Sequence, residues 1–326
     1  MTVTMPRSPL VRVTDAYSDP ELLLKLAVAN APYPAPVSGY NDPPQSSRIP
    51  WFKAVWVPRS PAPAGIEGLL HSPRLVEGAK AMFDATIVRP TKILANLMGP
   101  MPALPPHVDP PMFRGVDRWS ESPNPSTGRF SGKRALVGLM GTSELFEHWR
   151  VCNATAVMWY YGGDNGEYLY WPNGASEPAT ALPEATVALV GDNERVFHGI
   201  GDVGRPDQYL ESGTITPTSE LRWDDGRWVL VDGDRTILDW SVDEVRISVV
   251  WKATCFVDEA DAARYDEHTD DLTVDQVTDI FRADLARRGI DVAAPADPLT
   301  DNAWFRALIS TYGFPKQPGS RRRANR

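Results

Sequence analysis

The chain is poor in cysteine and in long apolar runs, and both shortages limit what it can be. It contains two cysteines in 326 residues, Cys152 and Cys255, and they do not form a Cys-x-x-Cys pair. Two cysteines are too few for a disulfide framework, so we expect buried thiols. No stretch reaches the roughly 18 consecutive apolar residues of a membrane span, and residues 1–10 contain no apolar signal segment. These absences predict a cytoplasmic protein without a membrane partner.

Positive charge is also scarce, since 33 lysines and arginines are outnumbered by 42 aspartates and glutamates, for a net charge of −9. Nucleic-acid-binding domains usually present a basic face, so we expect no nucleic-acid partner. The basic cluster Arg321-Arg322-Arg323, with Arg326, lies in a tail at 316–326 that we expect to be disordered.

Short strands separated by turn residues dominate the middle of the chain. Apolar or alternating segments are interrupted by glycine, aspartate and asparagine, and they lie at 93–98, 153–161, 167–171, 185–190, 195–200 and 245–256. This spacing is typical of an antiparallel sandwich or barrel. Two Asp-Gly turns between aromatic and β-branched residues predict a small meander at 219–240.

Helix signals lie on both sides of these strands and suggest a division of the chain. The capping box Thr273-Val274-Asp275-Gln276 predicts a helix that ends at Gly289, and further helices are expected at 143–150 and 301–312. We therefore expect an N-terminal helical and coil extension packed on the core, a catalytic core, a meander inserted in the core and a C-terminal helical extension. Their ranges are 1–90, 91–257, about 201–244 and 258–315.

His107-Val108-Asp109 lies among prolines and places an imidazole two residues from a carboxylate. In an extended chain, residues i and i+2 point to the same face, so both side chains can approach one metal ion. A third ligand is required, and His198 in the strand-like run 195–200 is the candidate; a buried histidine bonded to a backbone carbonyl is the alternative. A second pair, His268-Thr269-Asp270, lies in an acidic stretch and is interpreted as solvated surface. Two histidines and one carboxylate are typical of non-haem Fe(II) sites.

Arg246 and Ser248 lie on the last long strand, where alternate residues share a face. A guanidinium fork and a hydroxyl together suit a buried carboxylate. An exposed strand arginine is the alternative interpretation.

The ordered set of His107, Asp109, His198, Arg246 and Ser248 resembles the Fe(II)/2-oxoglutarate-dependent oxygenases, over about residues 90–257. The resemblance implies a mainly β fold with flanking helices, whose core is a double-stranded β-helix (jelly roll, cupin-like). It implies that the two histidines and the aspartate bind Fe(II). It also implies that 2-oxoglutarate chelates the iron, while Arg246 and Ser248 bind its far carboxylate.

The activity implied is hydroxylation, or desaturation or ring closure, of a small molecule with O2, coupled to decarboxylation of 2-oxoglutarate to succinate. The retained Asp109 separates the chain from related halogenases, which have a small residue there. One departure is the 48 positions between His198 and Arg246, where this family usually has one short turn. We attribute the gap to the inserted meander.

Substrate contacts are expected from polar, aromatic and sulfur-containing residues near the motif: Asn96, Met98, Arg114, Arg118, Trp119, Trp159 and Tyr161. Core packing or a solvated loop is the alternative for each. Two other functions stay open: a cupin-like isomerase or hydrolase that uses the metal without 2-oxoglutarate, and a non-catalytic jelly-roll binding protein with structural histidines. A homodimer formed through the C-terminal helices and the meander is also open.

Overall fold

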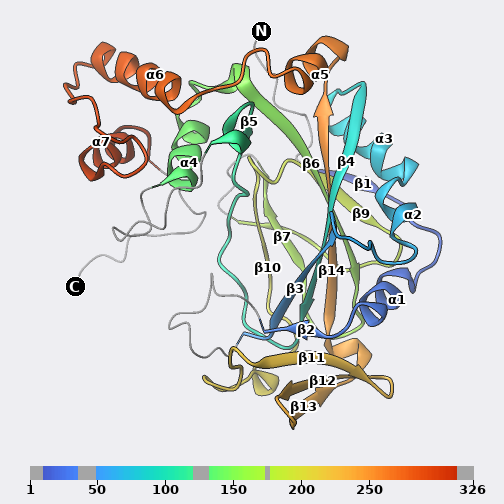
Figure 1. Cartoon of the computed structure of the whole chain (residues 1–326). Helices are drawn as coiled ribbons and strands as arrows, with labels where there is room; N and C mark the ends of the chain where they lie inside the picture. The colour runs from blue at the N-terminus through green and yellow to red at the C-terminus, as the bar shows by residue number, and fades with distance from the viewer. Residues whose placement is uncertain (1–9, 36–48, 120–131, 173–176, 314–326) are drawn as a thin grey trace.

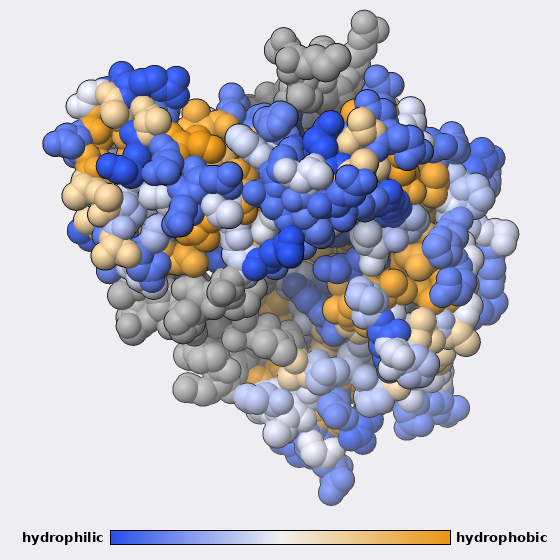
Figure 2. Space-filling model, turned by 45° about the horizontal axis from the view of Figure 1, so that its top comes forward, coloured by the Kyte–Doolittle hydropathy of each residue, from blue (hydrophilic) through white to orange (hydrophobic). Residues whose placement is uncertain are grey.

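Antiparallel strands form the centre of the structure, and helices cover one face and one end (Figure 1). The computed structural model describes residues 10–35, 49–119, 132–172 and 177–313, so the predicted basic tail at 316–326 lies outside the described residues. In the described part of the chain, no helix combines the length and the apolar character needed to cross a bilayer. Hydrophilic residues predominate on the face shown in Figure 2, and hydrophobic residues form scattered patches.

Two sheets build the core, and we call them the large and the small sheet. The large sheet has the order β1 (Leu10–Val13), β9 (Ala188–Gly191), β6 (Arg150–Tyr160), β14 (Arg246–Phe256), β4 (Ile87–Met98) and β3 (Trp51–Val57), with β5 (Met112–Phe113) paired to β6. The small sheet has the order β10 (Phe197–Ile200), β7 (Tyr168–Trp171) and β8 (Ala179–Ala181). All of these pairings are antiparallel.

The chain passes back and forth between the two sheets. After β4 it forms backbone bridges beside β10, at Met101 with Val203 and at His107 with His198. It then runs through β6 in the large sheet, β7 and β8 in the small sheet, β9 in the large, β10 in the small and β14 in the large. This path begins at β4 and ends at β14. Because β4 and β14 are neighbours in the large sheet, its last strand lies next to its starting strand. This topology confirms the predicted double-stranded β-helix, or jelly roll.

Alternation along the strands of the large sheet gives it two different faces. On β14, Ile247, Val249 and Trp251 are fully buried in the core beneath the helices. Helix α3 (Pro73–Phe83) packs closely there, because a Cβ on Gly78 would lie 2.6 Å from Val13 Cγ2. The opposite face, which we call the inner face, packs on the small sheet through a cluster that contains Trp159.

The N-terminal region contributes strands as well as helices. Strands β1 and β3 extend the large sheet at its two edges, while α1 (Leu22–Ala29), α2 (Ile66–Leu70) and α3 cover the outer face (Figure 1). The expected helical and coil extension at 1–90 is therefore also part of the sheet. In β3, Phe52 and Trp56 are buried under the helices, and Trp51 and Lys53 lie on the inner face.

The predicted meander forms a separate sheet at the lower end of the molecule in Figure 1. Its order is β13 (Arg235–Trp240), β12 (Arg227–Asp232), β11 (Ser219–Asp224) and β2 (Tyr33–Pro34). It lies in the chain between β10 and β14, which accounts for the long gap between His198 and Arg246. Short 3-10 turns flank it at η4 (Pro206–Gln208) and η5 (Val242–Glu244).

The C-terminal helices pack around α4 (Lys133–Ser143) in a second core. The helices in this core are α6 (Val274–Arg287) and α7 (Asn302–Tyr312), while α5 (Glu259–Asp266) follows β14 directly and packs against it. The predicted capping box is confirmed, since Thr273 Oγ1 accepts a hydrogen bond from the backbone N–H of Gln276 at 3.2 Å. The helix expected at 143–150 is wrong: α4 ends at Ser143, where Glu144 has a positive φ of 59°, and only the 3-10 turn η2 (Glu147–Trp149) follows.

Candidate metal centre

His107, Asp109 and His198 meet where the segment after β4 pairs with β10. One ligand atom from each residue lies within 4.8 Å of those of the other two. The two histidines lie opposite each other, because the N–H of each donates to the carbonyl of the other at 2.9 Å. The N–H of Asp109 donates to the carbonyl oxygen of Asn193 at 2.7 Å. Backbone pairing therefore positions the three side chains that the sequence analysis selected.

The ring nitrogens of both histidines suit metal binding. His198 Nδ1 lies 3.0 Å from the carbonyl oxygen of Val196, so we assign the proton to Nδ1 and leave the Nε2 lone pair available. His107 Nδ1 lies 3.5 Å from the carbonyl oxygen of Pro105. Burial lowers the pKa of His107 and lowers that of His198 to about 4. Both imidazoles are neutral at neutral pH, which is the form that binds a metal.

Asp109 is held by a lysine that the sequence analysis did not select. Burial alone would raise the pKa of Asp109, but the positive charge of Lys252 and its hydrogen bond lower it overall. Lys252 Nζ lies 2.6 Å from Asp109 Oδ2. The carboxylate is therefore ionised, and its other oxygen is available for a cation. Two neutral imidazoles and one carboxylate fit Fe(II) with positions left open.

Arg246 is fully buried, and it is linked to this cluster through Tyr168, which acts on it electrostatically and whose ring stacks on His198. Its Nε donates to the carbonyl oxygen of Gly166 at 2.8 Å, and Nη1 lies 4.0 Å from Met98 Sδ. Its Nη2 has no hydrogen-bond partner in the described structure. Burial lowers the pKa of Arg246 to about 10, so it remains a cation at neutral pH. A buried cation with an unsatisfied N–H is costly, and it indicates a binding site for an anion.

Ser248, Trp159 and Gly166 surround the side chain of Arg246. Ser248 is buried two residues along the same face, with Asn96 and Trp159 as its cross-strand partners. The guanidinium carbon of Arg246 lies 6.0 Å from the ring centroid of Trp159. Gly166 has a φ of +80°, and a Cβ there would lie 3.2 Å from Arg246 Cδ. Glycine therefore permits the close approach of this backbone to the guanidinium.

The seven expected substrate contacts divide into two groups. Asn96, Met98 and Trp159 lie on the inner face, and Asn96 Oδ1 accepts a hydrogen bond from Trp51 Nε1 at 3.0 Å. Tyr161 acts electrostatically on Arg246, and its hydroxyl donates to the carbonyl oxygen of Asp164.

The structure does not bring Arg114, Arg118 and Trp119 to the cluster. Arg114 is buried and its Nε donates to Asp270 at 2.7 Å, while Trp119 Nε1 donates to the carbonyl oxygen of Leu272. Arg118 forms an ion pair with Asp271. These contacts join this loop to the segment before α6. The interpretation of Asp270 as solvated surface is also wrong, because the fork of Arg114 binds it.

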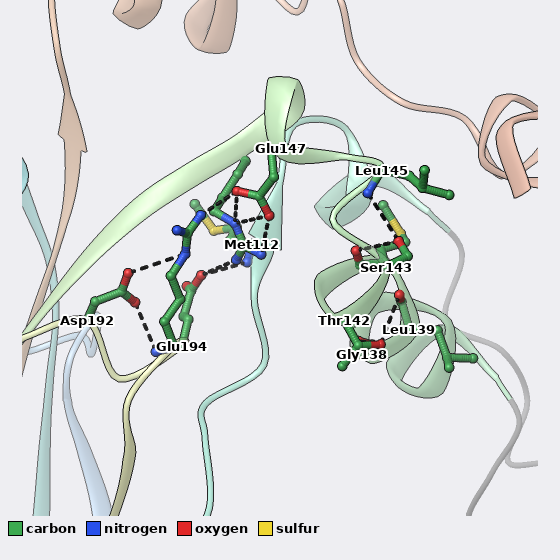
Figure 3. A network of polar contacts seen from close by, with 12 residues as sticks. Met112, Gly138, Leu139, Thr142, Ser143, Leu145, Glu147, Asp192 and Glu194 are labelled. Carbon is green, nitrogen blue, oxygen red and sulfur yellow. Dashed lines mark hydrogen bonds and ion pairs between the residues drawn. The ribbon is translucent and has the colours of Figure 1, made fainter. Parts of the chain in front are cut away.

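A second polar network fixes the loop that carries Asn193 (Figure 3). Glu194 accepts hydrogen bonds from Asn153 Nδ2 at 3.0 Å and from the N–H of Met112 at 3.3 Å, and Arg150 lies at 3.3 Å. Glu147 binds Arg150 and Arg195. Asn193 Nδ2 lies 3.3 Å from His198 Nε2, the nitrogen that we assign to the metal, so this loop reaches the cluster itself. Neither Asn193 nor Lys252 was selected from the sequence.

Glu194 is expected to make stability depend on pH. Burial raises its pKa from 4.5 to about 7. A raised carboxyl pKa favours the folded state at low pH, and this contribution is lost as the pH rises from 4.5 to about 7. Glu194→Gln removes that loss, so its unfolding free energy relative to wild type should rise by about 1–3 kcal/mol between pH 5 and pH 8. Urea unfolding of both proteins at the two pH values measures the change; a constant difference would contradict it.

Comparison with known proteins gives structural similarity only. No protein-family model matches the sequence, and no curated protein matches it. Among similar solved structures are an oxidoreductase of the 2OG-Fe(II) oxygenase family from Burkholderia pseudomallei (12% identity, 76% of this chain and 84% of that chain, TM-score 0.39) and a prolyl-4-hydroxylase from Pseudomonas putida (11%, 77% and 94%, 0.38). HygX from Streptomyces hygroscopicus, solved with nickel, 2-oxoglutarate and hygromycin B, is similar at 7% identity (76% and 83%, 0.38).

Proposed function

We propose that this chain is an Fe(II)/2-oxoglutarate-dependent oxygenase that hydroxylates, desaturates or cyclises a small molecule. The observation that carries this proposal is the pairing of the His107, Asp109 and His198 cluster with the buried cation Arg246. A metal site alone would not explain a guanidinium with an unsatisfied buried N–H nearby. A dianionic cosubstrate that chelates the metal and reaches Arg246 explains both.

Each residue of the site would have a separate role in binding the metal or the cosubstrate. His107, Asp109 and His198 would hold Fe(II), with Lys252 retaining one oxygen of Asp109. Arg246 and Ser248 would bind the far carboxylate of 2-oxoglutarate, and Trp159 would help to exclude water from it. With Fe(II) and 2-oxoglutarate bound, the site would gain chemistry that couples O2 consumption and release of CO2 and succinate to oxidation of the substrate.

Turnover in the presence of candidate metabolites tests the proposal. Succinate release should require Fe(II), O2 and 2-oxoglutarate together, and it should increase when the correct small molecule is added. Metal-dependent turnover that is indifferent to 2-oxoglutarate would favour the cupin-like isomerase or hydrolase. Absence of tight metal binding would favour a non-catalytic binding protein.

Other features of this proposal rest on the sequence. The cytoplasmic location, the boundaries near residues 90 and 257, and a homodimer stay predictions. Sedimentation of the purified chain tests the dimer.

A further inference from the structure

The inner face of the large sheet continues past the metal cluster towards the edge strand β3. Register pairs Lys53 with Asn96 and Val55 with Leu94, and one step further it pairs Lys92 with Lys252. All of these residues belong to the inner set, because the intervening residues of β3, β4 and β14 are buried under the helices. Three successive rows therefore lie roughly 6.7 Å apart along the strands, one of them apolar between two that carry lysine.

We call Lys53, Lys92 and Lys252 the basic rim, and it borders the metal cluster. Lys252 contacts Asp109 directly at 2.6 Å. Lys92 is the cross-strand partner of Lys252, so their Cα atoms are about 5 Å apart. Lys53 Nζ lies 3.4 Å from the centroid of a Trp51 ring, and its charge contributes to lowering the pKa of His107.

The row between the lysines is apolar and partly open to solvent. Val55 is 48% exposed, and Leu94 and Val250 are intermediate in exposure. Val55 and Leu94, in the row between Lys53 and Lys92, therefore offer a small apolar surface to a ligand. A ligand that reaches the metal from this side would cover it and gain the free energy of removing apolar surface from water.

In the proposed loaded site, the charge of Lys92 has no opposite charge beside it among the described residues. Two positive charges of Fe(II) balance two negative charges of 2-oxoglutarate, and Asp109 balances Lys252. Glu167 acts on Arg246 and offsets it. Lys92 is exposed and forms no ion pair with any residue that the structure describes. A cation that remains at the rim of a protein with a net charge of −9 marks a local site for an anion.

We propose that the substrate is a small amphipathic anion: its apolar body lies on Val55 and Leu94, and its carboxylate or phosphate pairs with Lys92 and is attracted by Lys53. The assignment of this anion as substrate rests on the proposed oxygenase function. Lysine ammonium groups bind either anion as point charges, so the common chemistry is the negative charge.

Three probes of equal chain length test the proposal: octanoate, octyl phosphate and the uncharged octanamide. Each is titrated into protein loaded with Mn(II) and 2-oxoglutarate, and again into protein without them, while tryptophan fluorescence is recorded, because Trp51 lies beneath Lys53. At least one anion should bind about tenfold more tightly than octanamide. The comparison of octanoate with octyl phosphate shows which anionic group the rim prefers.

Substitution of the rim lysines provides a second test of the proposal. Lys92→Met and Lys53→Met should each weaken binding of the preferred anion about fivefold and leave octanamide unchanged. Lys80→Met, on the distant helix α3, is the matched control and should bind like wild type. The proposal is overturned if no anion binds, if octanamide binds equally well, or if Lys92→Met has no effect. Binding of 2-oxoglutarate is measured in the same proteins: its absence, with anion binding still sensitive to Lys92, would overturn the oxygenase function but leave the anion site.

Discussion

Replacing His198 with alanine is expected to abolish Fe(II) binding and succinate formation. The substitution removes one of three ligands and leaves His107 and Asp109, which cannot hold the ion alone. Loss of residues that merely orient a ligand costs roughly 10–100-fold in metal affinity, so loss of the ligand itself should exceed about 100-fold. His107→Ala should have the same effect, and isothermal titration with Fe(II) under nitrogen measures both.

The matched control for these variants is His71→Ala. His71 lies after α2, is exposed and contacts Glu67, so its loss should leave metal affinity unchanged. Thermal unfolding of the metal-free proteins checks that the histidine variants are folded. If both folded variants retained iron as tightly as wild type, the proposed metal site would have to be abandoned.

Replacing Arg246 with methionine is expected to reduce 2-oxoglutarate affinity by at least about 30-fold, because loss of one partner of a buried charge pair costs roughly 2–5 kcal/mol. Metal affinity should remain, since Arg246 is not a ligand. The metal-free protein should keep nearly its wild-type stability: the lost hydrogen bond to Gly166 is offset by removal of a cation that burial already disfavours. Titration of 2-oxoglutarate into Mn(II)-loaded protein and urea unfolding measure the two effects.

Two further variants sharpen this test. Arg246→Lys keeps the charge but loses the two-pronged geometry, so its affinity should lie between those of wild type and Arg246→Met. Arg222→Met removes an exposed arginine of the meander and should change neither property. Unchanged 2-oxoglutarate affinity in a metal-binding Arg246→Met protein would assign the anchor to another residue.

The sequence was informative where chemistry and local pattern coincide. Short strands with turn residues predicted an antiparallel sandwich or barrel, and the ordered set of His107, Asp109, His198, Arg246 and Ser248 implied the jelly roll by resemblance. The capping box at Thr273 predicted the start of α6 to the residue. Helix α4 was missed, because Gly138 and Gly141 lie within it and lower its helical signal.

The missed site residues have a common cause. A lysine in a strand is normally read as facing solvent, and only the register of β3, β4 and β14 shows that Lys53, Lys92 and Lys252 lie on the inner face. Alternation with Arg246 and Ser248 along one strand was the signal available for Lys252. The pairing of Arg114 with Asp270 joins residues 156 positions apart, which no local pattern reveals.

The reciprocal backbone bonds between His107 and His198 make this centre sensitive to strand alignment. A slip of one residue between these two segments would turn one imidazole to the opposite side of the sheet. An ion bound by both rings would therefore penalise misaligned chains, and it would stabilise the correct pairing by mass action. The bound metal would in this way stabilise the correct pairing of the segment around His107 with β10, in addition to any part it takes in chemistry.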